Sequence, residues 1–250
     1  MDYFGRGFWP KLRTMTRRRW IADELPDPNH AALTGEHADH LIRVLRAQVG
    51  QEFDIATGFT VRRGRISNIH KHRVEFELGE ELPQTSAVNI TLLLSIFKFD
   101  RMEWAIEKCT ELGVVKIIPL LARRTDAHLT STAAKRLERW RKIALQAAEQ
   151  SRRAAPPEIA VPVKVQEAVK MPGSLRILLN ESEQQETLRE TLSAHKSDTH
   201  ILLAIGPEGG WTEDELQMFQ QQGWFSASLG ATILRAETAA IAATAITIAE

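Results

Sequence analysis

A glycine-rich loop with the sequence IGPEGG, residues 205 to 210, lies between an apolar run and the start of an expected helix. Glycine loops at helix N-termini usually bind phosphate, because free backbone N–H groups and the positive end of the helix dipole attract anions. Here Glu208 would repel a phosphate, and Pro207 removes one donor N–H. The loop therefore carries either a solvated turn acid or a site for a neutral or cationic ligand. The chain has no GxGxxG, GKS, GKT or HExxH motif, so the common nucleotide and zinc-protease signatures are absent.

A second charged group stands at the start of the C-terminal helix, where LRAETAA places Arg235 and Glu237 before the stretch TAAIAATAITIA. A helix that is apolar nearly all round must be buried against the sheet, another domain or a second subunit. A charged pair at its start then lies close to buried surface. Two interpretations are open: Arg235 and Glu237 form a structural ion pair, or Arg235 faces a substrate while Glu237 positions it or a ligand.

The elements around these residues predict an α/β protein. Apolar strands alternate with amphipathic helices from residue 88 to residue 250, which is typical of a parallel sheet covered on both faces. The expected strands are 89–97, 114–122, 175–181, 200–206 and 225–230, and the expected helices are 100–113, 133–153, 183–195, 212–223 and one from 236 onward. Ligands of such sheets bind beyond the C-terminal ends of the strands. The loops LLNES, GPEGGW and LGATILRAETAA should meet there, and their four glycines, Gly206, Gly209, Gly210 and Gly230, would let a flat ligand approach the main chain.

The first third of the chain has a different pattern. Short, turn-bounded runs such as HRVEFELGEEL, where Val74, Phe76 and Leu78 alternate with acids, predict a small and mostly β domain with one short helix. We place this domain at residues 17–81 and a linker at 81–87. Residues 1–16 show no period and are expected to be a disordered extension.

Composition limits the classes of function. The formal net charge is zero, so any case for nucleic-acid binding depends on two local basic segments, 1–20 and 135–153, which are either a polyanion surface or solvated faces. Cys109 is the single cysteine, which excludes an intrachain disulfide and a cysteine-based zinc site, and its helical spacing predicts a buried thiol. No apolar run approaches the roughly 18 residues of a membrane span. We expect a soluble, cytoplasmic protein without a metal.

Four segments together resemble one known family. KFDRMEWAIEKCTELGV, ERWRKIALQAAEQSRR, IGPEGGWTEDEL and LGATILRAETAA are similar to the successive signatures of the ribosomal RNA small subunit methyltransferase E family, in the SPOUT class of S-adenosylmethionine-dependent methyltransferases. The resemblance covers residue 17 to the end of the chain. It implies an N-terminal PUA-like β-barrel, a C-terminal domain with a trefoil knot, a homodimer through that domain, and methylation of N3 of one uridine in 16S rRNA of the small ribosomal subunit. The residue pattern alone predicts an unknotted sheet.

The resemblance also implies site residues. The cofactor S-adenosylmethionine is expected to contact Leu179, Asn180, Glu181, Gly206, Pro207, Glu208, Gly209, Gly210, Leu229, Gly230, Ile233, Leu234, Arg235 and Thr238. For catalysis we expect Arg235 to favour the uracil imide anion, with Arg152 as a second candidate and Glu237 as a conceivable base. The RNA-binding candidates are Arg17, Arg18, Arg19, Arg62, Arg63, Arg65 and Arg153.

Three alternatives remain open at this point. A SPOUT-type enzyme for another RNA position would share these motifs. A non-catalytic RNA-binding factor for ribosome assembly could keep the fold, although intact glycine loops and Arg235 speak against it. An unrelated α/β enzyme with a nucleotide cofactor is disfavoured by the absent phosphate signature.

Overall fold

The computed structural model describes residues 19–58, 60–82 and 88–250, and the chain divides into two compact units between residues 82 and 83. The expected extension 1–16, Arg17, Arg18 and most of the expected linker lie outside the described residues. In the part of the chain that the structure describes, no helix is both long and apolar enough to cross a bilayer.

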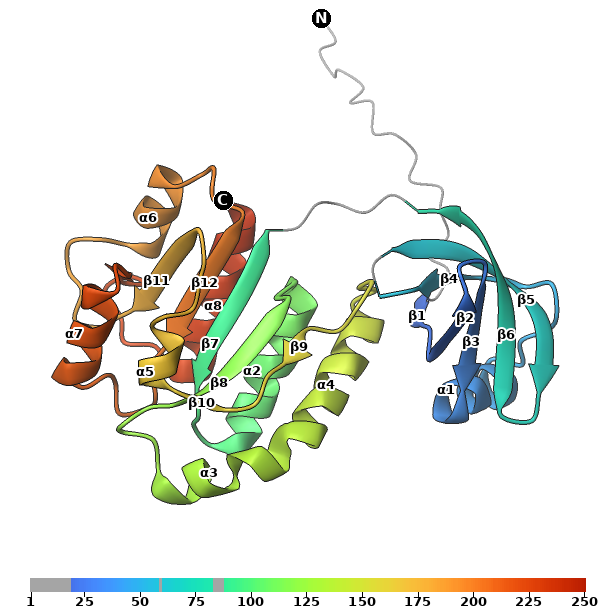
Figure 1. Cartoon of the computed structure of the whole chain (residues 1–250), viewed down its shortest axis with the longest axis horizontal. Helices are drawn as coiled ribbons and strands as arrows, with labels where there is room; N and C mark the ends of the chain where they lie inside the picture. The colour runs from blue at the N-terminus through green and yellow to red at the C-terminus, as the bar shows by residue number, and fades with distance from the viewer. Residues whose placement is uncertain (1–18, 59, 83–87) are drawn as a thin grey trace, which may run out of the picture. The chain divides into compact units, whose positions relative to one another are not determined.

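The first unit is a six-stranded sheet with one short helical segment (Figure 1). Its strands are β1 (Arg19–Ile21), β2 (Glu24–Asp27), β3 (His30–Thr34), β4 (Glu52–Ala56), β5 (Val61–His70) and β6 (Arg73–Glu81), in the order β1-β4-β5-β6-β3-β2. The helix α1 (Gly35–Asp39) continues into a π-helical turn (His40–Val44). Val74, Phe76 and Leu78 are buried as their alternation predicts. No pairing joins β1 to β2 among the described strands, so the expected closed β-barrel is not confirmed.

The second unit contains a seven-stranded, fully parallel sheet (Figure 1). Its strands are β7 (Asn89–Ser95), β8 (Lys116–Leu121), β9 (Glu158–Ile159), β10 (Val163–Lys164), β11 (Leu175–Leu179), β12 (His200–Ile205) and β13 (Phe225–Ala227). The order is β10-β8-β7-β12-β11-β13, with β9 also paired to β8. The five predicted strands are confirmed within a few residues. The short β9 and β10 were missed because two residues cannot display a period.

Helices cover both faces of this sheet, as a near-continuous apolar strand pattern requires. They are α2 (Phe99–Leu112), α3 (Ala127–Thr132), a 3₁₀ segment (Ala133–Arg136), α4 (Leu137–Gln150), α5 (Val165–Ala168), α6 (Leu188–Ala194), α7 (Glu213–Gln221) and α8 (Ala236–Ala249). Within β7, Leu92 and Leu94 join the core under α2, α4, α6 and α8, whereas Leu93 joins the core under α5 and α7. Because the sheet is parallel, the strand C-termini lie along one edge.

The helix starts and buried side chains mostly match the predictions made from the sequence. Thr212 caps α7 through a reciprocal capping box with Glu215, as TEDEL predicts. The helix expected at 183–195 begins later, at Leu188, because Thr187 supplies the cap. Cys109 is buried in α2 as predicted, and burial raises the pKa of its thiol to about 12.

Candidate functional site

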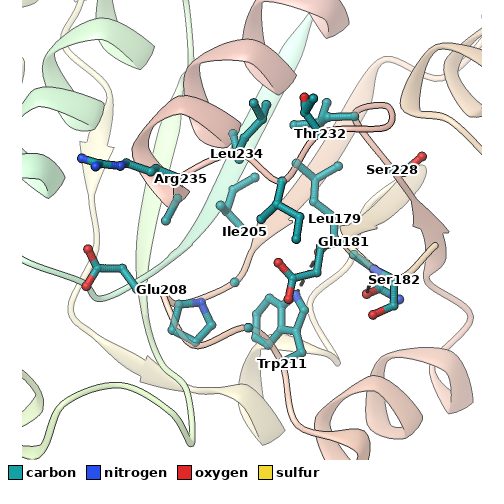
Figure 2. A pocket seen from close by; sticks show the side chains of 18 of the residues that line it. Leu179, Glu181, Ser182, Ile205, Glu208, Trp211, Ser228, Thr232, Leu234 and Arg235 are labelled. Atoms are coloured by element: carbon teal, nitrogen blue, oxygen red, sulfur yellow. Dashed lines mark hydrogen bonds between the residues drawn. The ribbon is translucent and has the colours of Figure 1, made fainter. Parts of the chain in front are cut away.

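The loops after β11, β12 and β13 enclose one cavity of about 440 Å³, within the range of small-molecule sites (Figure 2). Its lining is Arg101, Arg124, Leu179, Asn180, Glu181, Ser182, Ile205, Gly206, Pro207, Glu208, Gly210, Trp211, Leu216, Ala227, Ser228, Leu229, Gly230, Ala231, Thr232, Ile233, Leu234, Arg235, Ala236 and Ala239. The prediction that these three strand ends meet is therefore confirmed. Most of this wall is main chain or apolar side chain.

Two glycines of the central loop are required by close approach. A methyl group on Gly206 would lie 3.1 Å from Nε1 of Trp211, whose indole donates a hydrogen bond to the carbonyl of Leu179 at 2.9 Å. Gly210 has a φ of +71°, and a methyl group there would lie 3.0 Å from Oε1 of Glu181. Bulkier residues at either position would therefore strain the loop or occupy the cavity.

Glu208 forms a contact that neither interpretation of the loop foresaw. Its Oε1 accepts a hydrogen bond from Nη1 of Arg101, in the first turn of α2, at 2.8 Å. The same guanidinium reaches Glu237 in the first turn of α8, with Nε 3.7 Å from Oε1. Arg101 thus neutralises two carboxylates and joins the loop after β12 to the starts of α2 and α8.

Glu237 is the buried member of this trio. Its side chain is 5% exposed, and its Oε2 has no hydrogen-bond partner. No ion pair joins Arg235 to Glu237 among the described residues, so the structural pair considered from the sequence is not formed and Arg101 takes its place. Arg235 instead precedes α8 as an exposed residue at the cavity, with extended backbone.

A second arginine supports the loop from β8. Arg124 donates from Nη1 to the carbonyls of Gly209, at 2.9 Å, and Trp211, at 3.1 Å. The backbone N–H of Arg123 donates to Oε1 of the buried Glu215 at 2.8 Å. The sequence predictions did not include Arg101 and Arg124, although both lie within four residues of the end of an expected strand, which was the available signal.

Most of the expected cofactor contacts line the cavity, and Figure 2 labels several of them. Those at the wall are Leu179, Asn180, Glu181, Gly206, Pro207, Glu208, Gly210, Leu229, Gly230, Ile233, Leu234 and Arg235. Gly209 and Thr238 are not part of the wall. Gly209 packs against Arg124, and Thr238 is an exposed residue in the first turns of α8.

Arg152 and Arg153 lie away from the cavity. Arg153 donates to the carbonyls of Thr110, at 2.8 Å, and Val114, at 2.6 Å, which precede β8, whereas the cavity lies beyond the strand C-termini. Burial lowers the pKa of Arg153 to about 10. These two backbone hydrogen bonds compete with the expected role of Arg153 in binding RNA, which stays a prediction. Arg152 is exposed beside it and does not line the cavity of this chain, so its expected catalytic role stays a prediction.

The expected RNA contacts in the first unit are partly engaged as well. Arg62 donates to the backbone carbonyls of Gly79, Leu78 and Pro28. Arg63 lies 3.5 Å from Asp54, Arg19 is half-buried, and Arg65 is exposed. For Arg62 a role in binding phosphate conflicts with these three backbone hydrogen bonds.

No cluster of three or more histidine, cysteine, aspartate or glutamate side chains suited to a metal ion occurs within the described ranges. The cavity wall instead offers backbone, apolar side chains, the carboxylates of Glu181 and Glu208, and the guanidinium groups of Arg101, Arg124 and Arg235. Backbone and apolar groups of this kind suit an organic ligand with a flat ring.

Comparison with known proteins gives consistent matches. Residues 84–248 match the RNA methyltransferase domain family. The chain is 34% identical to the ribosomal RNA small subunit methyltransferase E of Rickettsia conorii, over 91% of this chain and 93% of that protein, and 30% identical to that of Bacillus subtilis, over 83% and 85%. Among solved structures, the methyltransferase E of Neisseria gonorrhoeae bound to S-adenosyl methionine is 32% identical with a TM-score of 0.78, covering 92% of this chain and 96% of that one. A Legionella pneumophila methyltransferase solved with the same cofactor is 27% identical with a TM-score of 0.77, covering 94% and 98%.

Proposed function

The chain belongs to the ribosomal RNA small subunit methyltransferase E family and is an S-adenosylmethionine-dependent rRNA methyltransferase, and we propose that it methylates N3 of one uridine in 16S rRNA. The observation that carries the proposal is the glycine-walled cavity at three adjacent strand ends. The relatives with this name match the chain along most of their length.

The cavity fits the cofactor by chemistry. An adenine can be read by main-chain N–H and C=O groups, and Gly206 and Gly210 at the cavity wall have no side chain to screen theirs. The carboxylate of Glu181, which forms no ion pair among the described residues, is compatible with a cationic sulfonium. When bound, S-adenosylmethionine supplies an electrophilic methyl group.

The chemistry of uracil defines what the protein must add. N3 carries a proton, so its lone pair becomes available only as that proton leaves, and a cation near the uracil carbonyl oxygens favours the imide anion. We assign this role to Arg235, which is exposed at the cavity and forms no ion pair or side-chain hydrogen bond among the described residues. Glu237 is buried behind Arg101, outside the cavity wall, so we assign it to positioning and not to proton transfer.

Methyl transfer to small ribosomal subunits that lack native methylation tests the proposal. Subunits and naked 16S rRNA are incubated with labelled S-adenosylmethionine, and the modified nucleoside is identified. We expect 3-methyluridine. Another labelled nucleoside would refute the N3 assignment, and cofactor binding without any transfer would refute 16S rRNA as the substrate.

The role of Arg235 has its own test. We expect Arg235→Ala to lower kcat by about 10²- to 10³-fold, the usual loss of one electrostatic donor, while the affinity for S-adenosylmethionine measured by calorimetry changes little. Arg235→Lys should recover part of kcat because the charge is kept. A loss of cofactor affinity that accounts for the whole effect would contradict the catalytic assignment.

The resemblance also carries proposals about architecture. We propose an RNA-binding β domain of the PUA-like type at 17–81, a SPOUT domain at 88–250 and a trefoil knot formed as the segment 228–235 leads from the edge strand β13 to α8, which packs on β12 and β7. The knot would contradict the general rule against threaded chains.

We also propose a homodimer through the second unit. Support comes from apolar side chains left exposed on the outer helical layer, namely Trp104 at 47% and Ile248 at 41%. Sedimentation at micromolar concentration tests this proposal, and a monomer would refute it.

A further inference from the structure

Three of the arginines expected to bind RNA are occupied within the fold, so phosphate contacts are also expected among cations that the fold leaves unpaired. A guanidinium that already stabilises backbone carbonyls or a carboxylate has little to offer a phosphate, because that contact would first have to be broken. Arg62, Arg63 and Arg153 are in this position. Beside the cavity, Arg101 and Arg124 are likewise engaged with the loop after β12.

Three cations at the same edge of the sheet are not engaged. Lys98 precedes α2, Arg123 follows β8, and Arg235 precedes α8; all three are exposed, and none forms an ion pair or side-chain hydrogen bond among the described residues. We call these three residues the cationic rim. They come from three different elements that start or end at the C-terminal edge of the parallel strands.

Contacts between neighbouring loops and helix starts hold the rim segments side by side. Thr125 Oγ1 donates to the carbonyl of Ile96 at 3.3 Å, which joins the loop after β8 to the loop after β7 that carries Lys98. The strands β7 and β8 are direct neighbours. Arg101 joins the first turn of α2 to the first turn of α8 through Glu237, and so brings the segments of Lys98 and Arg235 together.

Three carboxylates near the rim are already engaged with other partners. Glu208 pairs with Arg101, Glu103 pairs with Arg139 at 2.6 Å, and Glu215 accepts backbone N–H groups. The exposed Asp100 lies in the first turn of α2, where the helix dipole offsets its charge. The exposed acids Glu181, Glu213 and Asp214 also lie at this edge, but no ion pair joins them to a rim cation among the described residues. The rim cations therefore keep their charges available for a polyanion.

We propose that Lys98 and Arg123 of the cationic rim bind the phosphates of a single-stranded RNA segment whose target base enters the cavity and meets Arg235. The proposal rests on the proposed function and deepens it, because it locates the RNA path on the second unit. Single-stranded RNA is the partner since a base must leave its stack to reach a methyl donor held inside a cavity. The rim binds backbone, so it supplies affinity and register without reading sequence.

The test is the salt dependence of RNA binding by the full chain. The variant K98Q/R123Q removes two rim charges and spares Arg235, which has a proposed catalytic role. Its matched control is K170Q/K196Q, which removes two exposed lysines, also free of ion pairs among the described residues, that precede β11 and β12 at the opposite edge. A fluorescein-labelled single-stranded oligouridine is the probe, and calorimetry with S-adenosylmethionine verifies that each variant is folded.

Each lost phosphate contact lowers the magnitude of the negative slope of log Kobs against log salt by about 0.7 for a single strand. We therefore expect K98Q/R123Q to lower the magnitude of the slope by about 1.4 and K170Q/K196Q to leave it unchanged. An unchanged slope in K98Q/R123Q, or an equal change in the control, would overturn the proposal.

Methyl transfer by the unmodified protein is measured in parallel. Methyl transfer to rRNA by the unmodified protein, together with an unchanged salt slope in K98Q/R123Q, would overturn the rim proposal alone. A rim-dependent slope without any transfer would overturn the proposed function and leave the rim as an RNA-binding surface.

Discussion

Arg101 is predicted to be the main electrostatic support of the site, and its removal gives a sharp test. Arg101→Gln deletes the partner of Glu208, whose side chain is 39% exposed, and of Glu237, whose side chain is 5% exposed. The exposed carboxylate can return to water at little cost. The buried one cannot, and its Oε2 already lacks a partner.

The magnitudes follow from this difference in burial. Stranding a buried carboxylate by removing its partner costs about 3 kcal/mol, whereas breaking an exposed pair costs less than about 1 kcal/mol. Arg101→Gln should therefore lower the free energy of unfolding by about 3 kcal/mol, and Glu208→Gln by less than about 1 kcal/mol. The double variant R101Q/E237Q replaces the stranded charge by an amide and should recover about 2 kcal/mol.

Urea unfolding followed by tryptophan fluorescence gives these values, and a thermal scan should place Arg101→Gln about 6 to 12 °C below the parent. Cofactor calorimetry separates the second role of Arg101: R101Q/E237Q should be stable again yet bind S-adenosylmethionine more weakly, because Glu208 and its loop remain unanchored. Equal costs for Arg101→Gln and Glu208→Gln, or no recovery in R101Q/E237Q, would refute the reasoning.

Three further predictions concern single positions. Gly210→Ala should weaken cofactor binding about tenfold, since its methyl group would lie 3.0 Å from Glu181. Gly35→Ala, also at positive φ but in open space, is the control and should lower stability alone. Equal cofactor affinities of the two variants would contradict this prediction. Arg153→Met should lower the free energy of unfolding in urea by about 2 kcal/mol, because the side chain donates to two backbone carbonyls. The salt dependence of RNA binding should not change, and a changed slope would identify Arg153 as an RNA contact. Cys109 should react with an alkylating reagent at pH 8 only as fast as the protein unfolds, because burial raises its pKa to about 12 and keeps it a thiol. The stability that the buried thiol contributes is present below its unfolded pKa and falls as the pH rises toward 12. Rapid labelling of the folded protein would disprove the burial.

The sequence by itself determined the architecture of the second unit and the location of its site. Apolar runs such as NITLLLSIF alternate with amphipathic helices, and hydrophobic burial leaves few arrangements for that pattern besides a parallel sheet between two helical layers. The glycine loop and LRAETAA were then placed at the same edge by chain direction alone. Capping at Thr212 and burial of Cys109 were also readable, because both depend on neighbours within one helix.

Only the tertiary structure decided which charges are free. Glu208 and Arg101 are 107 positions apart, and Arg153 meets the carbonyl of Thr110 from 43 positions away, so no local pattern contains these pairs. A run of basic residues has the same sequence pattern whether its guanidinium groups face solvent or donate to backbone carbonyls. The fold resolves this by desolvation: a buried charge must find a partner, and that partner is supplied by whichever element packs against it.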